Sequence, residues 1–141
     1  MIEDAALFEL LSLECRVTDG AVYYYNALGQ IHREHGPAVV YSDGSKFWYQ
    51  GGRLHKLDDP AIVRPNGYRA WYQNGQRHRL DGPAVDRPDG YRAWWQNGQL
   101  HRLDGPAVEN SDGDCEWYIN GEELTEAEWQ QAAASMEWCS A

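Results

Sequence analysis

Hydrophobic and polar positions recur every 23 residues along most of the chain. One repeat starts with the turn signal Pro88-Asp89-Gly90, continues through the aromatic segment Tyr91–Gln96, reverses at Asn97-Gly98 and returns along Gln99–Arg102. Proline presets φ, and Asn-Gly between two extended segments is the strongest short hairpin signal. Leu103–Pro106 then ends the return strand, because proline has no N–H for a ladder hydrogen bond. The pattern predicts a β-hairpin and a linking turn in each repeat.

Several residue types keep this period at once. Pro65–Val85 and Pro88–Val108 differ at only three of 21 positions. The residues in register are His32, His55, His78 and His101; Pro37, Pro60, Pro83 and Pro106, each followed by alanine; and Gly44, Gly67, Gly90 and Gly113. Because an isolated hairpin is marginally stable in water, the units must stack to bury their rings. We predict an all-β fold: an elongated antiparallel sheet of five 23-residue hairpin repeats over residues 21–124.

An aromatic pair lies in each of these repeats. Strand alternation places one member of each pair on either face of the sheet. The first members from the second repeat onward are Trp48, Trp71, Trp94 and Trp117, and the second members are Tyr49, Tyr72, Trp95 and Tyr118. Either the sheet curls to enclose one aromatic ladder, or one ladder stays exposed for a partner.

The two ends of the chain depart from the repeat, as capping segments do. Residues 1–20 are expected to form an N-terminal cap with a short helix over Ile2–Leu13, and residues 125–141 a C-terminal capping helix. Thr125 and Glu128 have the spacing of a capping box, in which threonine accepts from the N–H three residues on and glutamate reaches back. An apolar stripe would then cover the open end of the sheet. Its members are Trp129, Ala132, Ala133 and Met136.

The repeated motif Trp-Tyr-x-Asn-Gly-x-x-His-Arg-x-Asp-Gly-Pro-Ala resembles the MORN-type repeats over roughly residues 23–124. The resemblance is to the bacterial and phage variant of these short β-hairpin units. It implies tandem hairpins and membership of a group that includes antitoxin-like proteins and phage proteins. The commonest MORN pattern has Gly-rich Tyr-x-Gly-x-Trp units, from which this chain departs by its inserted His-Arg-x-Asp-Gly-Pro-Ala.

Composition narrows the class of protein. The 141 residues include 22 Asp and Glu against 12 Lys and Arg. No apolar stretch approaches the roughly 20 residues of a membrane span, and the N-terminus lacks the basic start of a secretory signal. The three widely spaced cysteines form no Cys-x-x-Cys pair, so we expect neither a disulfide framework nor a zinc finger, and we expect a cytoplasmic location, that of the bacterial host if the protein is phage-encoded. The formal charge of −10 argues against nonspecific binding to a nucleic-acid backbone.

Histidines and aspartates that keep the same spacing in each repeat raise the hypotheses of a row of metal sites or of acid–base catalysis. A structural role is the stronger interpretation. A histidine can donate to the aspartate three residues on and hold the Asp-Gly-Pro turn. The structural set is His32, His55, His78, His101, Asp58, Asp81 and Asp104. His35 and Asp59 break the pattern in the first two repeats. Without a nucleophile elbow, a phosphate-cradling loop or His-Glu-x-x-His, we expect no enzyme activity, cofactor or metal.

Charge is concentrated at the C-terminal end, where residues 109–141 hold nine acids and no base. This end either solvates the repeat stack or attracts a basic partner. We therefore expect a non-enzymatic protein-binding module: a phage or bacterial inhibitor, such as an anti-CRISPR-like, anti-defence or antitoxin protein. Its partner would be a nucleic-acid-processing protein with a basic surface. The candidate partner-binding residues are Glu116, Glu122, Glu123, Glu126, Glu128, Trp71, Trp94 and Trp117.

The alternative function is recognition of single-stranded nucleic acid or a small ligand along the Trp and Arg face. Arg69 and Arg92 lie two residues before tryptophans on the same face, and such interleaving can stack bases. Arginine can equally serve as internal cation–π glue. Oligomeric state and the identity of the partner are left open.

Overall fold

The computed structural model describes residues 13–140. Their fold is mostly β with a single C-terminal helix, and it divides the chain into two compact units, residues 1–76 and residues 77–141. The predicted helix over Ile2–Leu13 lies almost wholly outside the described residues. Residues 14–18, which belong to the segment that we assigned to the N-terminal cap, form a β-strand. No helix within residues 13–140 is long and apolar enough to cross a membrane.

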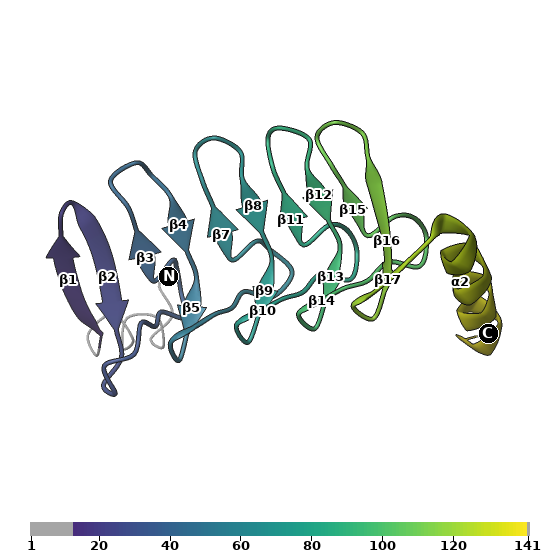
Figure 1. The fold of residues 1–141 in the computed structure, drawn as a ribbon. Helices are drawn as coiled ribbons and strands as arrows, with labels where there is room; N and C mark the ends of the chain where they lie inside the picture. The colour runs from purple at the N-terminus through teal and green to yellow at the C-terminus, as the bar shows by residue number, and fades with distance from the viewer. Residues whose placement is uncertain (1–12, 141) are drawn as a thin grey trace, which may run out of the picture. The chain divides into compact units, whose positions relative to one another are not determined.

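The first unit is an antiparallel sheet with small hairpins on its lower side in Figure 1. Its sheet strands follow the order β1-β2-β3-β4-β7-β8. The strands are β1 (Glu14–Thr18), β2 (Ala21–Tyr25), β3 (Val39–Val40), β4 (Lys46–Phe47), β5 (Tyr49–Gln50), β6 (Arg53–Leu54), β7 (Ile62–Val63), β8 (Arg69–Ala70), β9 (Tyr72–Gln73) and β10 (Gln76–Arg77), whose second residue is the first of the second unit.

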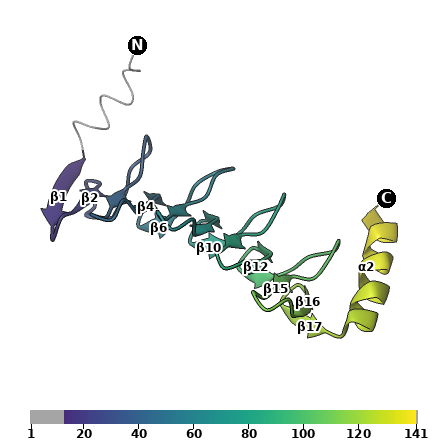
Figure 2. The same cartoon turned by 90° about the horizontal axis from the view of Figure 1, so that it is seen from above.

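The second unit repeats this design and adds the helix. Its sheet strands follow the order β11-β12-β15-β16-β17. The elements are β11 (Val85–Asp86), β12 (Arg92–Ala93), β13 (Trp95–Gln96), β14 (Gln99–Leu100), β15 (Val108–Glu109), β16 (Cys115–Ile119), β17 (Glu122–Leu124) and α2 (Glu126–Ser140). Figure 2 shows α2 beyond β17 at the end of this unit.

Most repeats contain two small hairpins rather than the single one predicted. The expected strand Tyr91–Gln96 is divided at Trp94 into β12 and β13. The N–H of Trp94 donates to Ala107 O at 2.8 Å, and its carbonyl accepts from the N–H of His101 at 3.0 Å. Trp94 therefore bonds in two directions: β12 pairs in the sheet with β11 and β15, while β13 pairs with β14.

Turn chemistry follows the prediction closely. Asn97 and Gly98 have φ of 51° and 79°, the left-handed pair that a type I′ hairpin turn requires. At the other turn of the repeat, the carboxylate of Asp89 accepts from the N–H of Tyr91 at 3.1 Å, and Gly90 supplies the positive φ of 95°. The first turn needs a residue that accepts a positive φ, whereas the second needs a side-chain oxygen, which Asn66 supplies at the same place in the preceding repeat.

The core of the repeats is made of small residues. The alanine that follows each repeated proline has no exposed surface; these residues are Ala38, Ala61, Ala84 and Ala107. In the first unit, Val39, Phe47, Ile62 and Ala70 form a buried cluster, against which Tyr49 and Tyr72 pack. Among the described residues, the second aromatic ladder thus contributes to the core of that unit.

Helix α2 begins at the predicted capping box. The N–H of Glu128 donates to Thr125 Oγ1 at 3.2 Å, and the Thr125 hydroxyl donates to Glu128 Oε1 at 2.9 Å. Trp129 and Ala133 are buried in a cluster with Ile119, and Ala132 packs against it. Met136, predicted to share this stripe, is 37% exposed. The helix therefore covers the hairpin β16–β17 with its first two turns.

We predict that Ala107→Val destabilises the protein, because a side chain with no exposed surface has no room for two further methyl groups. The free energy of unfolding in urea should fall by about 1–3 kcal/mol. Ala127→Val, at an exposed helix position, is the matched control and should cost only a few tenths of a kcal/mol. Equal losses in both variants would show that burial at the Pro-Ala position is unimportant.

Candidate functional site

Each of the four periodic histidines is fixed to the tight turn that follows it in the next repeat. Its Nδ1 accepts a hydrogen bond from a backbone N–H nineteen residues later, at 2.9–3.0 Å in all four cases. The pairs are His32 with Gly51 and His55 with Asn74 in the first unit, and His78 with Asn97 and His101 with Asn120 in the second. We call this contact the histidine clamp.

A second hydrogen bond completes each clamp. In the last one, the N–H of Gly121 donates to Leu100 O at 2.8 Å, next to the bond from Asn120 to His101. Two adjacent N–H groups of one turn are thereby held by two adjacent residues of the previous repeat. Because Nδ1 is an acceptor, the imidazole in this contact is neutral and carries its proton on Nε2.

The predicted partner of these histidines was wrong. We expected each histidine to donate to the aspartate three residues on, but the arginine that follows the histidine takes this place. Arg79 Nε donates to Asp81 at 3.0 Å and Arg102 Nε to Asp104 at 2.9 Å. In the second repeat, Asp58 has a positive φ of 64°. The neighbouring Asp59 takes the carboxylate role there, with its Oδ2 3.9 Å from Lys56 Nζ.

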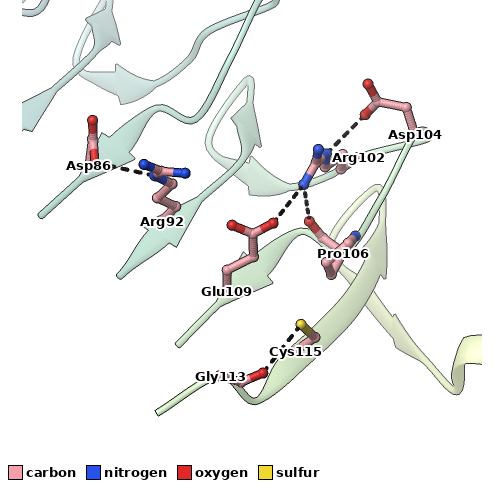
Figure 3. Close-up of polar contacts among 8 residues, drawn as sticks. All are labelled: Asp86, Arg92, Arg102, Asp104, Pro106, Glu109, Gly113 and Cys115. Atoms are coloured by element: carbon pink, nitrogen blue, oxygen red, sulfur yellow. Dashed lines mark hydrogen bonds and ion pairs between the residues drawn. The ribbon is translucent and has the colours of Figure 1, made fainter. Parts of the chain in front are cut away.

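Arg102 is the center of a polar junction, drawn in Figure 3. Its guanidinium contacts Asp104, the carbonyl of Pro106 at 3.1 Å and Glu109 at 3.4 Å. Its Cζ also lies 3.7 Å from the ring centroid of Trp94, a cation–π contact. One side chain therefore joins a loop, a strand and an aromatic ring, as the interpretation of arginine as internal glue predicted.

Glycine at position 105 makes room for this guanidinium. A Cβ on Gly105 would lie 2.7 Å from Arg102 Cζ, and Gly82 and Gly36 have the same relation to Arg79 and Arg33. The second repeat has lysine at the arginine position and Asp59 at the glycine position. Without a planar guanidinium to admit, the site tolerates a carboxylate that pairs with Lys56. The two departures from the repeat thus compensate each other.

The three candidate tryptophans are largely engaged inside the protein. Trp71 is only 6% exposed. Trp117 lies 4.6 Å from Trp129, ring centroid to ring centroid, beneath α2. Trp94 has one face under Arg102. Trp71 and Trp117 therefore offer little ring surface to a partner, while Trp94 lines a groove.

The five candidate glutamates lie around the end of the second unit rather than on one face. Glu123 is opposite Tyr118 in the β16–β17 register, and Glu116 shares that face by strand alternation. Trp117 and Leu124, on the other face, pack against the cluster beneath α2. The remaining three are exposed: Glu122 next to the hairpin turn, and Glu126 and Glu128 in the first turn of α2.

The acidic side chains at this end affect the pKa of Tyr118. Burial of the hydroxyl, followed by the charges of Glu123 and Glu116, raises the pKa of Tyr118 above its usual value of 10. Between residues 109 and 136 there is no Lys or Arg, and Glu109 alone in this stretch pairs with a cation, Arg102. The negative charge at this end is thus left without local neutralisation.

A groove lies between successive loops of the second unit. It has a volume of about 540 Å³ and is lined by Leu80, Asp81, Gly82, Trp94, Gln96 and residues 101–104. The first unit has an equivalent groove of about 350 Å³, lined by residues 33–36, Trp48, Gln50 and residues 55–57. Sequence reasoning missed both grooves, although the recurrence of leucine at positions 57, 80 and 103 was a signal for them.

Among residues 13–140, no three His, Cys, Asp or Glu side chains gather into a group that could hold a metal ion. Cys15 and Cys115 are free and exposed. A scan of protein-family models and a search of curated proteins gave no match to the chain. The resemblance to MORN-type repeats therefore stays a prediction.

We predict that Gly105→Ala lowers the free energy of unfolding by about 1–3 kcal/mol, because the added Cβ displaces Arg102 from its contacts. In an Arg102→Lys background, the same change should cost less than about half as much, since the planar group is gone. Urea unfolding of the four proteins of this double-mutant cycle measures the coupling. A cost that is identical in both backgrounds would contradict the steric relation.

We predict that the last histidine clamp weakens in acid. Burial lowers the pKa of His101 below its ordinary value of 6.5. The unfolded chain therefore binds this proton more readily than the folded one, so the stabilisation is complete above about pH 6.5 and is lost as the pH falls through the folded-state pKa. The protection factor of the Asn120 amide, which takes account of the slower intrinsic exchange in acid, should fall on going from about pH 7.5 to about pH 5.5.

His101→Gln isolates this effect, because an amide oxygen can accept the same bond without titrating. The variant should lose less stability than the native protein over the same pH interval, as measured by thermal unfolding. His35→Gln, which removes one histidine from outside the clamps, should behave like the native protein. Parallel curves for His101→Gln and the native protein would rule out His101 as the titrating group.

Proposed function

We propose that this protein is a non-enzymatic protein-binding module that acts as a phage or bacterial inhibitor of a nucleic-acid-processing protein. The binding surface is the acidic end of the second unit, and the partner contributes a basic surface of the kind that normally holds nucleic acid. A protein of this role acts in the bacterial cytoplasm, in the manner of an anti-CRISPR-like, anti-defence or antitoxin protein.

The observation that carries the proposal is the unneutralised charge of this end. The exposed carboxylates here are Asp112, Asp114, Glu122, Glu123, Glu126 and Glu128, with half-buried Glu116 beside them. These carboxylates lie in the turn before β16, in β16 and β17 themselves, and in the capped first turn of α2. Exposed carboxylates without cations beside them would attract a basic groove over several ångströms.

The repeated residues support a scaffold role rather than catalysis. The clamp histidines accept main-chain hydrogen bonds, and the junction arginines contact carboxylates, carbonyls and rings of this same chain. Groups engaged in this way position the repeats. The same engagement favours protein binding over the stacking of nucleic-acid bases, because one face of rings such as Trp48 and Trp94 is already covered by a cation of this chain.

We predict that replacing Glu122, Glu123, Glu126 and Glu128 by glutamine slows association with the partner about tenfold at low salt, because electrostatic steering is lost. Glutamine at position 128 keeps the capping box. The partner is first captured by the native protein from the heparin-binding fraction of a bacterial lysate, and association is then measured by surface plasmon resonance at low and high salt.

Glu122→Gln/Glu123→Gln and Glu14→Gln/Glu34→Gln provide charge-matched controls. Both pairs change the net charge equally, but the second pair lies in the other unit. The first pair should slow association and reduce its salt dependence, while the second should do so little. Equal slowing by both pairs would show that net charge alone causes the effect. If neither the first pair nor the fourfold variant slowed association, the proposal that the acidic end binds the partner would be refuted.

A further inference from the structure

The groove of the second unit presents carboxylates outward and keeps its cations inward. The side chains of Asp81 and Asp104 are 85% and 84% exposed, whereas those of Arg79 and Arg102, which contact them, are 24% and 19% exposed. Each arginine engages Oδ1 of its aspartate. The second oxygen of each carboxylate is available to a donor that enters from solvent.

Apolar surface accompanies these charges. Leu80 is 74% exposed in one wall of the groove, and Trp94 lines it. In the other wall, Leu103 packs against the cluster of Ile119, Trp129 and Ala133 beneath α2. The indole N–H of Trp129 donates to Arg102 O at 2.8 Å. The wall at Leu103 is therefore supported from behind by the helix whose first turn bears Glu126 and Glu128.

The equivalent groove of the first unit has a different chemistry. At the positions of Leu80, Asp81 and Arg102 it has Glu34, His35 and Lys56. Here a glutamate takes the place of the exposed leucine and a histidine takes the place of the first aspartate, and the lysine amino group lies 3.9 Å from the ring centroid of Trp48. The combination of a leucine, a tryptophan and two outward carboxylates belongs to the groove of the second unit.

We propose that this groove binds an extended segment of the partner protein in which a Lys or Arg side chain is flanked by apolar side chains. The cation lies between the carboxylates of Asp81 and Asp104, and the apolar neighbours contact Leu80, Leu103 and Trp94. This inference rests on the proposed function, since it names the segment of a basic partner that docks beside the acidic end. A phosphate backbone would meet two carboxylates here, so a nucleic acid is disfavoured.

The probe peptides are acetyl-Leu-Arg-Leu-amide, acetyl-Ala-Arg-Ala-amide and acetyl-Leu-Glu-Leu-amide. They are titrated into isotope-labelled full-length protein, and the Leu80 methyl and Trp94 indole signals are followed by NMR. The Leu-Arg-Leu peptide should bind saturably and shift both signals. The Ala-Arg-Ala peptide should bind at least about fivefold more weakly because apolar burial is lost, and the Leu-Glu-Leu peptide should not shift them.

Two variants distinguish the groove from a general charge effect. Asp81→Asn/Asp104→Asn should lower the affinity for the Leu-Arg-Leu peptide by at least about fivefold. The charge-matched Glu122→Gln/Glu123→Gln should change this affinity by less than about twofold. Leu80→Glu/Asp81→His introduces the first-unit residues at these two positions and should abolish the shift of the Trp94 indole signal. Retained spectral dispersion verifies that each variant is folded. Equal binding of the Arg and Glu peptides, or unchanged affinity in both groove variants, would overturn the inference, as would stronger shifts with a single-stranded oligonucleotide.

Failure here is separable from failure of the proposed function. If the peptide does not bind but the glutamine variants still slow association with the captured partner, the groove inference alone is wrong. If the peptide binds and the glutamine variants have no effect on association, the groove stands and the acidic end is refuted. If neither effect is seen, both proposals fail.

Discussion

The structure depends on one contact, the acceptance of a main-chain N–H by a histidine Nδ1. A two-residue turn exposes N–H groups that need partners, and an imidazole nitrogen reaches one of them while the adjacent carbonyl takes the other. The contact is directional, so it sets the distance and angle between one turn and the preceding repeat. Apolar packing by small alanines supplies burial but little directional information, which the histidine clamp provides.

Arginine and glycine form the second constraint. Because a guanidinium passes over the backbone at Gly105, the loop can stay close to the Trp94 ring and still satisfy the Pro106 carbonyl. In the second repeat lysine and aspartate replace the arginine and the glycine together, which shows that the residues at these two positions depend on each other. The positions tolerate change together, since an isolated Asp at the glycine position would meet the guanidinium. Sequence variation inside one chain therefore reveals which residues are in contact.

Much of the local structure was predictable from the sequence, because turn chemistry and periodicity are local. The Asn-Gly turns, the Thr125–Glu128 cap and the antiparallel pairing follow from short segments. The division of the aromatic strand at Trp94 was not predictable in this way, because it arises from a bond to Ala107 in the next repeat. The same reason explains the misassigned histidine partner. The aspartate three positions away was a plausible hydrogen-bond partner for the histidine, whereas the actual partner is a backbone N–H nineteen positions away.

The candidate binding surface was partly predictable. The lack of Lys and Arg within residues 109–141 is a property of the sequence, whereas the ion pair that Arg102 makes with Glu109 depends on the fold. Whether a tryptophan is available to a partner depends on its neighbours, so Trp71 and Trp117 could be judged only with their surroundings in view. The groove required the same information, since its walls come from two successive loops.

Trp129 has a consequence for how such a chain can change in length. Its ring packs at a tilt against that of Trp117, whereas earlier rings such as Trp94 receive a cation from the following segment. A further unit appended after Leu124 would compete with this indole for the same ring. Gene duplication could instead lengthen the array by copying an internal repeat, whose two ends already fit its neighbours. The contact between Trp129 and Trp117 at the end of the array would then stay unchanged. The near-identity of Pro65–Val85 and Pro88–Val108 is what such internal copying would produce.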